Sequence, residues 1–186
     1  MSFRSIEAIV EPNNLHYVGD GFRVYGILGR KEPLTMKRMS PFLLMDYAPP
    51  HYFPPNNGAQ RGVSSHPHRG IETVTIAYKG KVEHHDSSGG GGIIAEGDVQ
   101  WMTSGSGILH KEYHEKNFGK KGGEMQMVQL WVNLPAKDKM TTPKYQNLNK
   151  KNFAKIELEN NYFDNFFLFL QPIFPVDLLI VGSSPD

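Results

Sequence analysis

Polar and apolar residues alternate over short stretches of this chain, and glycines and prolines separate these stretches. Residues 16–30 predict two short strands on either side of a Gly-Asp-Gly turn. Residues 93–94, 99–102 and 124–133 predict further strands, and the last of these alternates polar with apolar side chains. Short strands separated by turns, with no long amphipathic helix, predict an all-β fold, either an antiparallel sandwich or a barrel.

Two further segments carry more specific expectations. Residues 72–86 predict a β-hairpin, because β-branched and aromatic residues flank a central turn at Gly80. Residues 41–55 are apolar and aromatic, but two Pro-Pro pairs interrupt them. Proline cannot donate a hydrogen bond to a neighbouring strand, so irregular structure is predicted for this segment.

The C-terminal part of the chain differs from the rest. Residues 150–161 are polar and charged, whereas residues 166–181 are strongly apolar. The apolar stretch is short for a membrane span, and prolines and polar residues interrupt it, so no membrane partner is expected. We predict a barrel domain over residues 1–150 and an irregular tail, a divergent or truncated segment, over residues 151–186.

The composition excludes several classes of site and partner. The 186 residues can bury one core, and 39% of them are hydrophobic, as in an ordinary globular protein. A formal net charge of +1 gives no electrostatic reason to expect direct nucleic-acid binding. The absence of cysteine excludes disulfides, thiolate metal sites and thiol nucleophiles. The N-terminal residues lack the apolar run of a signal peptide, so a cytoplasmic location is expected.

Two short segments carry residues that bind metal ions. In each segment imidazoles and carboxylates stand at alternate positions, which share one face of an extended chain. They are His66, His68 and Glu72 in the first segment and His110, Glu112 and His114 in the second. If both faces point into one barrel, burying these groups without a shared cation is costly, so the pattern predicts a divalent metal. Neutral imidazole and carboxylate suit Fe, Mn, Ni, Cu or Zn.

Several of these sequence features also have a simpler interpretation. A His-x-His pair arises by chance in a chain with eight histidines, but two segments of matching parity beside strand-like sequence are a stronger signal. His84 and His85 are interpreted as surface residues or as neighbours of the ligands, and Asp86 and Asp98 as turn formers. The run of four glycines lacks the Lys-Ser/Thr and the helix of a phosphate loop. No Gly-x-Ser-x-Gly elbow supports a serine hydrolase.

Longer runs of the sequence resemble the pirin family of the cupin superfamily. These runs are His66-Pro-His-Arg-Gly-Ile-Glu-Thr-Val-Thr, Glu83-His-His-Asp-Ser, Gly97-Asp-Val-Gln-Trp-Met-Thr-Ser-Gly-Ser-Gly-Ile-Leu-His-Lys-Glu and Gln129-Leu-Trp-Val-Asn-Leu-Pro. The resemblance extends over residues 14–150. It implies a cupin-type, jelly-roll-like antiparallel β-barrel that binds one divalent transition metal. Iron(II) is the expected ion, with Mn, Ni, Cu and Zn as alternatives.

The resemblance also implies a ligand set. The His-x-His and His-x-Glu motifs of pirin-like proteins match His66, His68, His110 and Glu112 here. The general cupin pattern would instead use Glu72 as the carboxylate ligand. We follow the pirin-like pattern, which makes Glu112 the fourth metal ligand and the candidate catalytic base.

Three functions follow from the resemblance as alternatives. Some pirin-like proteins show quercetin 2,3-dioxygenase activity, which predicts a small aromatic substrate such as a flavonol and Glu112 as the base that takes its hydroxyl proton. Others act as non-enzymatic, iron-dependent, redox-sensing coregulators of transcription, which predicts a protein partner. A truncated, inactive paralogue is the third, because Gly105 and His114 replace the Pro and Asn of the general cupin motif and a second, C-terminal barrel is expected to be missing.

Overall fold

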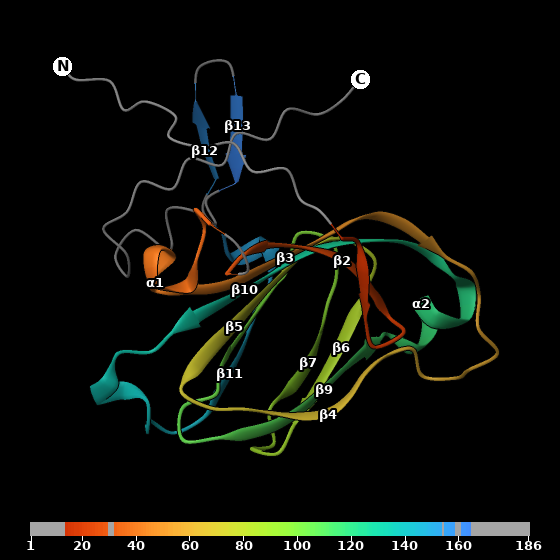
Figure 1. Cartoon of the computed structure of the whole chain (residues 1–186). Coiled ribbons are helices and arrows are strands. Elements are labelled where there is room, and N and C mark those ends of the chain that lie inside the picture. Colours follow the sequence, from red (N-terminus) through yellow and green to blue (C-terminus); the bar gives the residue numbers. More distant parts are fainter. Residues whose placement is uncertain (1–13, 30–31, 154, 159–160, 165–186) are drawn as a thin grey trace. The chain divides into compact units, whose positions relative to one another are not determined.

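A computed structural model provides the coordinates of the chain (Figure 1). The structure describes residues 14–29, 32–153, 155–158 and 161–164. The chain divides into two units, residues 1–149 and residues 150–186. The described part of the second unit contains a 3₁₀ turn, η2 (Lys150–Asn152), and an antiparallel pair of strands, β12 (Lys155–Leu158) and β13 (Asn161–Asp164). The apolar stretch over residues 166–181 lies outside the described residues, so the truncated segment stays a prediction.

The first unit contains two antiparallel sheets, one of seven strands and one of four. In spatial order the larger sheet has β1 (His16–Val18), β2 (Phe22–Leu28), β3 (Phe42–Phe53), β10 (Gly123–Asn133), β5 (Ile71–Lys79), β8 (Val99–Thr103) and β11 (Lys144–Leu148). The smaller sheet has β4 (Gly62–His68), β9 (Ile108–His114), β6 (Val82–Asp86) and β7 (Gly91–Ile94). Short helical segments are α1 (Met36–Met39), α2 (Lys116–Lys121) and η1 (Ala136–Asp138).

The two sheets lie opposite each other, with β3 and β10 in one layer and β4 and β9 in the other (Figure 1). Apolar side chains from both sheets fill the space between them: Phe22, Val24 and Met127 come from the larger sheet, and Val82 and Ile94 from the smaller one. This arrangement confirms the predicted antiparallel, cupin-type β fold. Among the described residues the two sheets are not closed into a barrel.

The predicted β-hairpin over residues 72–86 is wrong, although both of its strands exist. β5 pairs with β10 and β8 in the larger sheet, whereas β6 pairs with β7 and β9 in the smaller one. The turn at Gly80 therefore carries the chain from one sheet to the other. Its φ is +84°, which glycine adopts without the steric cost that a Cβ brings. Local turn chemistry predicted the change of direction but not the partner of each strand.

The irregular structure predicted for residues 41–55 is also wrong, because residues 42–53 form β3, the longest strand of the larger sheet. The register between β3 and β10 shifts between the pairs Ala48–Met127 and His51–Met125, so Pro49 and Pro50 lie at an irregularity of the ladder. On its other side β3 pairs with β2 only between Met45 and Tyr47. The prolines therefore stand where few backbone N–H groups are needed for pairing.

The other predicted strands are confirmed, including the two at residues 16–30 and those within β7, β8 and β10. Asp98 accepts a hydrogen bond from the backbone N–H of Ala95 at 3.0 Å, in agreement with its predicted role in a turn. Within the ranges that the structure describes, no helix has both the length and the apolar character that crossing a bilayer requires.

Candidate metal centre

The two histidine segments form neighbouring strands of the smaller sheet. β4 and β9 pair in antiparallel register, with His66 opposite His110 and Val63 opposite Glu112. Three residues of β4 therefore span the distance that two residues span on β9, which is a β-bulge at Ser64 and Ser65. The extra residue reverses the side-chain parity of β4, so His66 and His68 point to the same side of the sheet as Val63. Without the bulge both imidazoles would point away from the other sheet.

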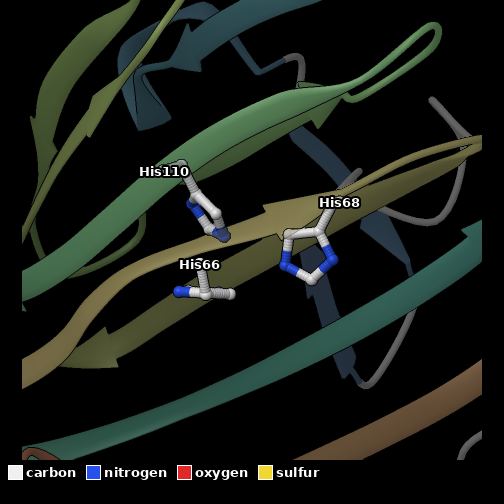
Figure 2. A group of neighbouring side chains, drawn as sticks. All are labelled: His66, His68 and His110. Carbon is white, nitrogen blue, oxygen red and sulfur yellow. The ribbon is translucent and has the colours of Figure 1, made fainter.

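The three imidazoles of His66, His68 and His110 meet at one place (Figure 2). One nitrogen of each ring lies within 4.8 Å of a nitrogen of the other two. The ring centroids are 4.3 Å apart for His66 and His110, 4.8 Å for His68 and His110 and 5.0 Å for His66 and His68. Three imidazole nitrogens gathered this closely form a candidate site for one metal ion.

The hydrogen bonds of two of these rings indicate which nitrogen faces the ion. The Nδ1–H of His66 donates to the backbone carbonyl of Ser64 at 2.8 Å, because a carbonyl oxygen only accepts. The lone pair of the neutral His66 ring then lies on Nε2. The Nδ1 of His110 is 3.2 Å from a ring nitrogen of His84, whereas its buried Nε2 has no hydrogen-bond partner among the described residues. Metal-binding imidazoles show this arrangement, with one nitrogen hydrogen-bonded and the other on the metal.

Burial keeps two of the rings uncharged at neutral pH. Desolvation, with a smaller contribution from His66, lowers the pKa of His68 to about 4. Desolvation, followed by the neighbouring His66 and His68 rings, lowers the pKa of His110 to about 2. A neutral imidazole offers a lone pair to a metal ion without first releasing a proton. The donor set of this site therefore fits a divalent metal.

Glu112 stands two residues beyond His110 on β9 and is buried. Its Oε1 accepts a hydrogen bond from Nε2 of Gln100 at 2.6 Å, and its Oε2 accepts one from Nε2 of Gln129 at 3.2 Å. The donor atoms of potential metal ligands form two groups. Glu112 belongs to the group with His84 and His110, and not to the group with His66 and His68, so the four predicted ligands are divided between the two groups. Each carboxylate oxygen retains a second lone pair, so the two amide bonds hold Glu112 without exhausting its capacity as an acceptor.

Two other candidate residues, His114 and Glu72, have different roles. The buried His114 donates from Nε2 to the carbonyl of Gly21 at 2.7 Å, and its ring packs edge-on against Phe53, so it is part of the core. Glu72 lies in the larger sheet, where it accepts a hydrogen bond from the hydroxyl of Thr103 at 2.6 Å. Glu72 and His114 are members of neither group of candidate ligands.

His84 is the residue whose role the sequence left most open. It is fully buried on β6 beside His110, whereas the next residue, His85, is exposed and pairs with Glu83. Asp86 accepts a hydrogen bond from the ring of His84 and, as predicted, also shapes the following turn through Ser88. The alternation of His84 and Asp86 along a strand is a signal that could have identified them as an inward-facing pair.

A cavity of about 790 Å³ adjoins the histidine cluster. His66, His68 and Glu112 contribute to its wall, and apolar side chains such as Phe22 and Met127 cover most of the remainder. Trp131 also lines the cavity, where its ring meets His68 edge-on with centroids 4.9 Å apart. A largely apolar cavity with a few convergent polar groups is typical of a site for a small organic ligand.

The family model described as pirin matches residues 21–132, which include all four predicted ligands. The chain belongs to the pirin family. A Pseudomonas aeruginosa protein provisionally named a quercetin 2,3-dioxygenase is 55% identical over 150 residues, covering 78% of this chain and 50% of that protein. A pirin-like protein of Solanum lycopersicum is 42% identical over 139 residues, covering 75% of this chain and 43% of that protein.

Solved structures agree with this assignment to the pirin family. The crystal structure of quercetin 2,3-dioxygenase from Acinetobacter baumannii is 56% identical and superimposes with a TM-score of 0.74, over 80% of this chain and 51% of that one. A protein from Geobacillus kaustophilus is 36% identical with a TM-score of 0.61, over 80% of this chain and 53% of that one. The chain thus spans about half the length of the pirin relatives that it matches.

Proposed function

We propose that this chain binds one divalent transition metal through His66, His68, His110 and Glu112, and that the loaded protein cleaves a flavonol such as quercetin with dioxygen. The observation that carries the proposal is the convergence of three imidazoles, two of which, His66 and His68, line the wall of a largely apolar cavity. The naming of its relatives as quercetin 2,3-dioxygenases supports the choice of substrate. Both atoms of dioxygen enter the products of a dioxygenase, so the reaction needs no external reductant.

Iron(II) is the proposed ion. Imidazole and carboxylate ligands also accept Mn, Ni, Cu and Zn, and availability decides among them as much as geometry does. When bound, the ion would supply Lewis acidity to the substrate's hydroxyl oxygen and lower the pKa of that hydroxyl. On a five- or six-coordinate ion these protein ligands leave one or two coordination positions open for the substrate, which distinguishes a catalytic site from a closed structural one.

Glu112 is proposed as a metal ligand and as the base that takes the hydroxyl proton of the flavonol. It lines the cavity, so a ligand there can reach it. The amides of Gln100 and Gln129 hold its two oxygens, which limits how the carboxylate can turn. Gln129 also accepts a hydrogen bond from the indole N–H of Trp131 at 3.2 Å. This orients the Gln129 amide, whose Nε2 donates both to Glu112 and to the hydroxyl of Thr75.

The cavity supports an aromatic substrate on physical grounds. Its volume of about 790 Å³ is within the range of roughly 300–1,000 Å³ that encloses small organic ligands. The apolar wall formed by residues such as Phe22 and Met127 would exclude water from the face of a flat ring system. Trp131 offers an aromatic surface next to His68 and therefore next to the proposed ion.

The test combines metal analysis with turnover. Protein purified without added metal is analysed for bound transition metals, and iron(II)- and manganese(II)-loaded samples are then given quercetin with and without oxygen. We expect oxygen uptake and loss of the flavonol absorbance only in loaded, aerobic samples, and neither in a Glu112→Gln variant that retains metal. A fully loaded protein that takes up no oxygen would count against the enzyme and favour the non-enzymatic, redox-sensing alternative. A protein that takes up no metal would contradict the proposal altogether.

A further inference from the structure

A hydrogen-bonded series of side chains extends from the histidine cluster into the smaller sheet. Its members are His110, His84 and Asp86. His84 and Asp86 stand two residues apart on β6, so both side chains point to the same side, and both are fully buried. The Nδ1 of His84 is 3.2 Å from the Nδ1 of His110, and the Nε2 of His84 is 3.0 Å from Oδ2 of Asp86. Tyr145 stacks on the His84 ring, with centroids 4.5 Å apart and planes 13° from parallel. His84 is therefore held between a carboxylate and a candidate metal ligand.

Asp86 sets the donor and the acceptor in both hydrogen bonds of this series. A carboxylate only accepts, so the Nε2 of His84 carries the proton of this bond. A neutral imidazole has one N–H, which leaves the Nδ1 of His84 as an acceptor. The Nδ1 of His110 must then carry a proton and donate it, which leaves the lone pair of a neutral His110 on Nε2. That atom is buried and has no hydrogen-bond partner among the described residues, and it is the one available to an ion beside His66 and His68.

We propose that Asp86 and His84 are positioning residues, which hold His110 in the tautomer and ring orientation that present its Nε2 lone pair to the metal. The inference rests on the proposed function only in naming His110 as a ligand; the tautomer itself is a property of the metal-free chain. A carboxylate or carbonyl behind a metal-binding histidine commonly has this role. Here an additional imidazole stands between the carboxylate and the ligand.

The competing arrangement makes His84 itself a ligand, because His84, His110 and Glu112 also bring their donor atoms within 4.8 Å of one another. Binding an ion through the Nδ1 of His84 would break the hydrogen bond between His84 and His110. If His110 bound that ion through its Nδ1, its buried Nε2 would stay without a partner among the described residues. The positioning role accounts for both ring nitrogens of His84 and for both of His110.

Asp86→Asn is the decisive variant because it reverses the donor–acceptor direction of the hydrogen bonds from residue 86 to His84 and His110. It does so with little change in the shape of the side chain. The Oδ1 of Asp86 accepts from the backbone N–H groups of Ser88 and Gly90, at 2.9 and 3.0 Å, and from the Ser88 hydroxyl at 2.6 Å. These three donors hold the amide oxygen of the new asparagine in the same place, so its NH₂ group faces His84. His84 must then accept through Nε2 and donate through Nδ1, which moves the proton of His110 to Nε2.

The measurement is ¹⁵N NMR of the imidazole rings in metal-free protein, followed by titration with zinc(II). In the wild type we expect His110 to carry its proton on Nδ1, and in Asp86→Asn on Nε2. Zinc affinity should fall about 10–100-fold in the variant, the usual cost of losing an outer partner of a metal-binding histidine. Glu83→Gln is the matched control, because Glu83 makes the same carboxylate–imidazole contact with His85, at 2.7 Å, on the exposed side of the same strand. It should change neither the His110 tautomer nor the zinc affinity.

Three results would overturn the inference: a wild-type His110 protonated on Nε2, an Asp86→Asn variant with unchanged tautomer and zinc affinity, or zinc bound directly to the Nδ1 of His84. The wild-type tautomer decides the matter even if Asp86→Asn does not fold. If the wild type shows the expected tautomer but takes up no zinc, the positioning of His110 is supported and the proposed metal function is contradicted. The two ideas therefore fail separately.

Discussion

His66 and His110 lie directly opposite each other on β4 and β9, with ring centroids 4.3 Å apart, although they are distant in the sequence. The two rings approach because a β-bulge at Ser64 and Ser65 reverses the parity of β4 just before His66. Strand pairing thus sets the position of the first histidine segment relative to the second. The site depends on backbone geometry as much as on the identity of its side chains.

The first prediction concerns His110, the ring that contacts both other histidines. His110→Ala should reduce metal affinity by more than the roughly 10–100-fold that follows loss of an outer hydrogen-bond partner, because the ligand itself is removed. Isothermal titration of metal-free protein with zinc(II) measures the change. His85→Ala removes an exposed imidazole from the neighbouring strand β6 and should leave the affinity unaltered. An unchanged affinity in His110→Ala would show that the ion binds elsewhere.

The second prediction concerns the pH dependence of the stability of metal-free protein. The pKa values of His68 and His110 are lowered from 6.5 to about 4 and about 2, so below pH 6.5 the unfolded chain binds protons that the folded chain does not. The free energy of unfolding should therefore be highest above pH 6.5. It should fall as the pH drops toward 4, by about 1.4 kcal/mol per pH unit for each ring.

Urea unfolding at pH 7.5, 6.0 and 5.0 measures this slope. His85→Gln, which removes an exposed histidine instead, should retain it. A free energy of unfolding that stays constant between pH 7.5 and 5.0 would mean that the buried rings are already charged in the folded protein.

The third prediction concerns Gln100, whose amide donates to the buried Glu112. Gln100→Leu retains most of the side-chain volume but leaves Oε1 of Glu112 without this donor. We expect a loss of about 1–3 kcal/mol in the free energy of unfolding, because a buried acceptor that loses its donor is costly. Gln126→Leu is the comparison, since Gln126 donates to the neutral hydroxyl of Tyr47 at 3.1 Å. Its cost should be smaller, about 0.5–1.5 kcal/mol, and equal losses in the two variants would show that the bond from Gln100 to Glu112 contributes no more than an ordinary neutral one.

The fourth prediction concerns Gly62, the first residue of β4. A Cβ at this position would lie 2.1 Å from the backbone oxygen of Glu112, so β4 and β9 pack too closely there for any side chain. Gly62→Ala should separate the strands, lower the free energy of unfolding by about 1–3 kcal/mol and weaken metal binding. Gly58 also has a positive φ, of +91°, but open space around it. Gly58→Ala should therefore cost only the backbone strain, about 1–2 kcal/mol, with metal affinity unchanged.

Metal affinity distinguishes the Gly62→Ala variant from the Gly58→Ala variant. Both glycine substitutions lower stability by comparable amounts, so the denaturation curves alone do not separate them. Zinc titration does, because only Gly62 adjoins the strand that carries His110 and Glu112. A Gly62→Ala protein with wild-type zinc affinity would show that the histidine cluster tolerates a displaced β4.

Parts of the site could be predicted from the sequence because strand parity is a local property. The alternation of His110, Glu112 and His114 along β9 correctly predicts that all three side chains face inward. It does not predict that His114 lies apart from the other three histidines, in the aromatic core, because that depends on which side chains of other strands are opposite it. In the same way, the sequence left His84 either at the surface or beside the ligands, and its burial next to His110 depends on the pairing of β6 with β9.

The sequence by itself determined the all-β class, most of the strands, the pirin family and the residue types that bind metals, because these follow from local periodicity and from long characteristic motifs. Only the tertiary structure decided the partners of β5 and β6, the continuation of β3 through its prolines and the bulge that turns His66 and His68 inward. These features depend on hydrogen bonds between strands that are distant in the sequence. Such pairing leaves no local signature, because each strand satisfies the same backbone groups with whichever neighbour the whole fold provides.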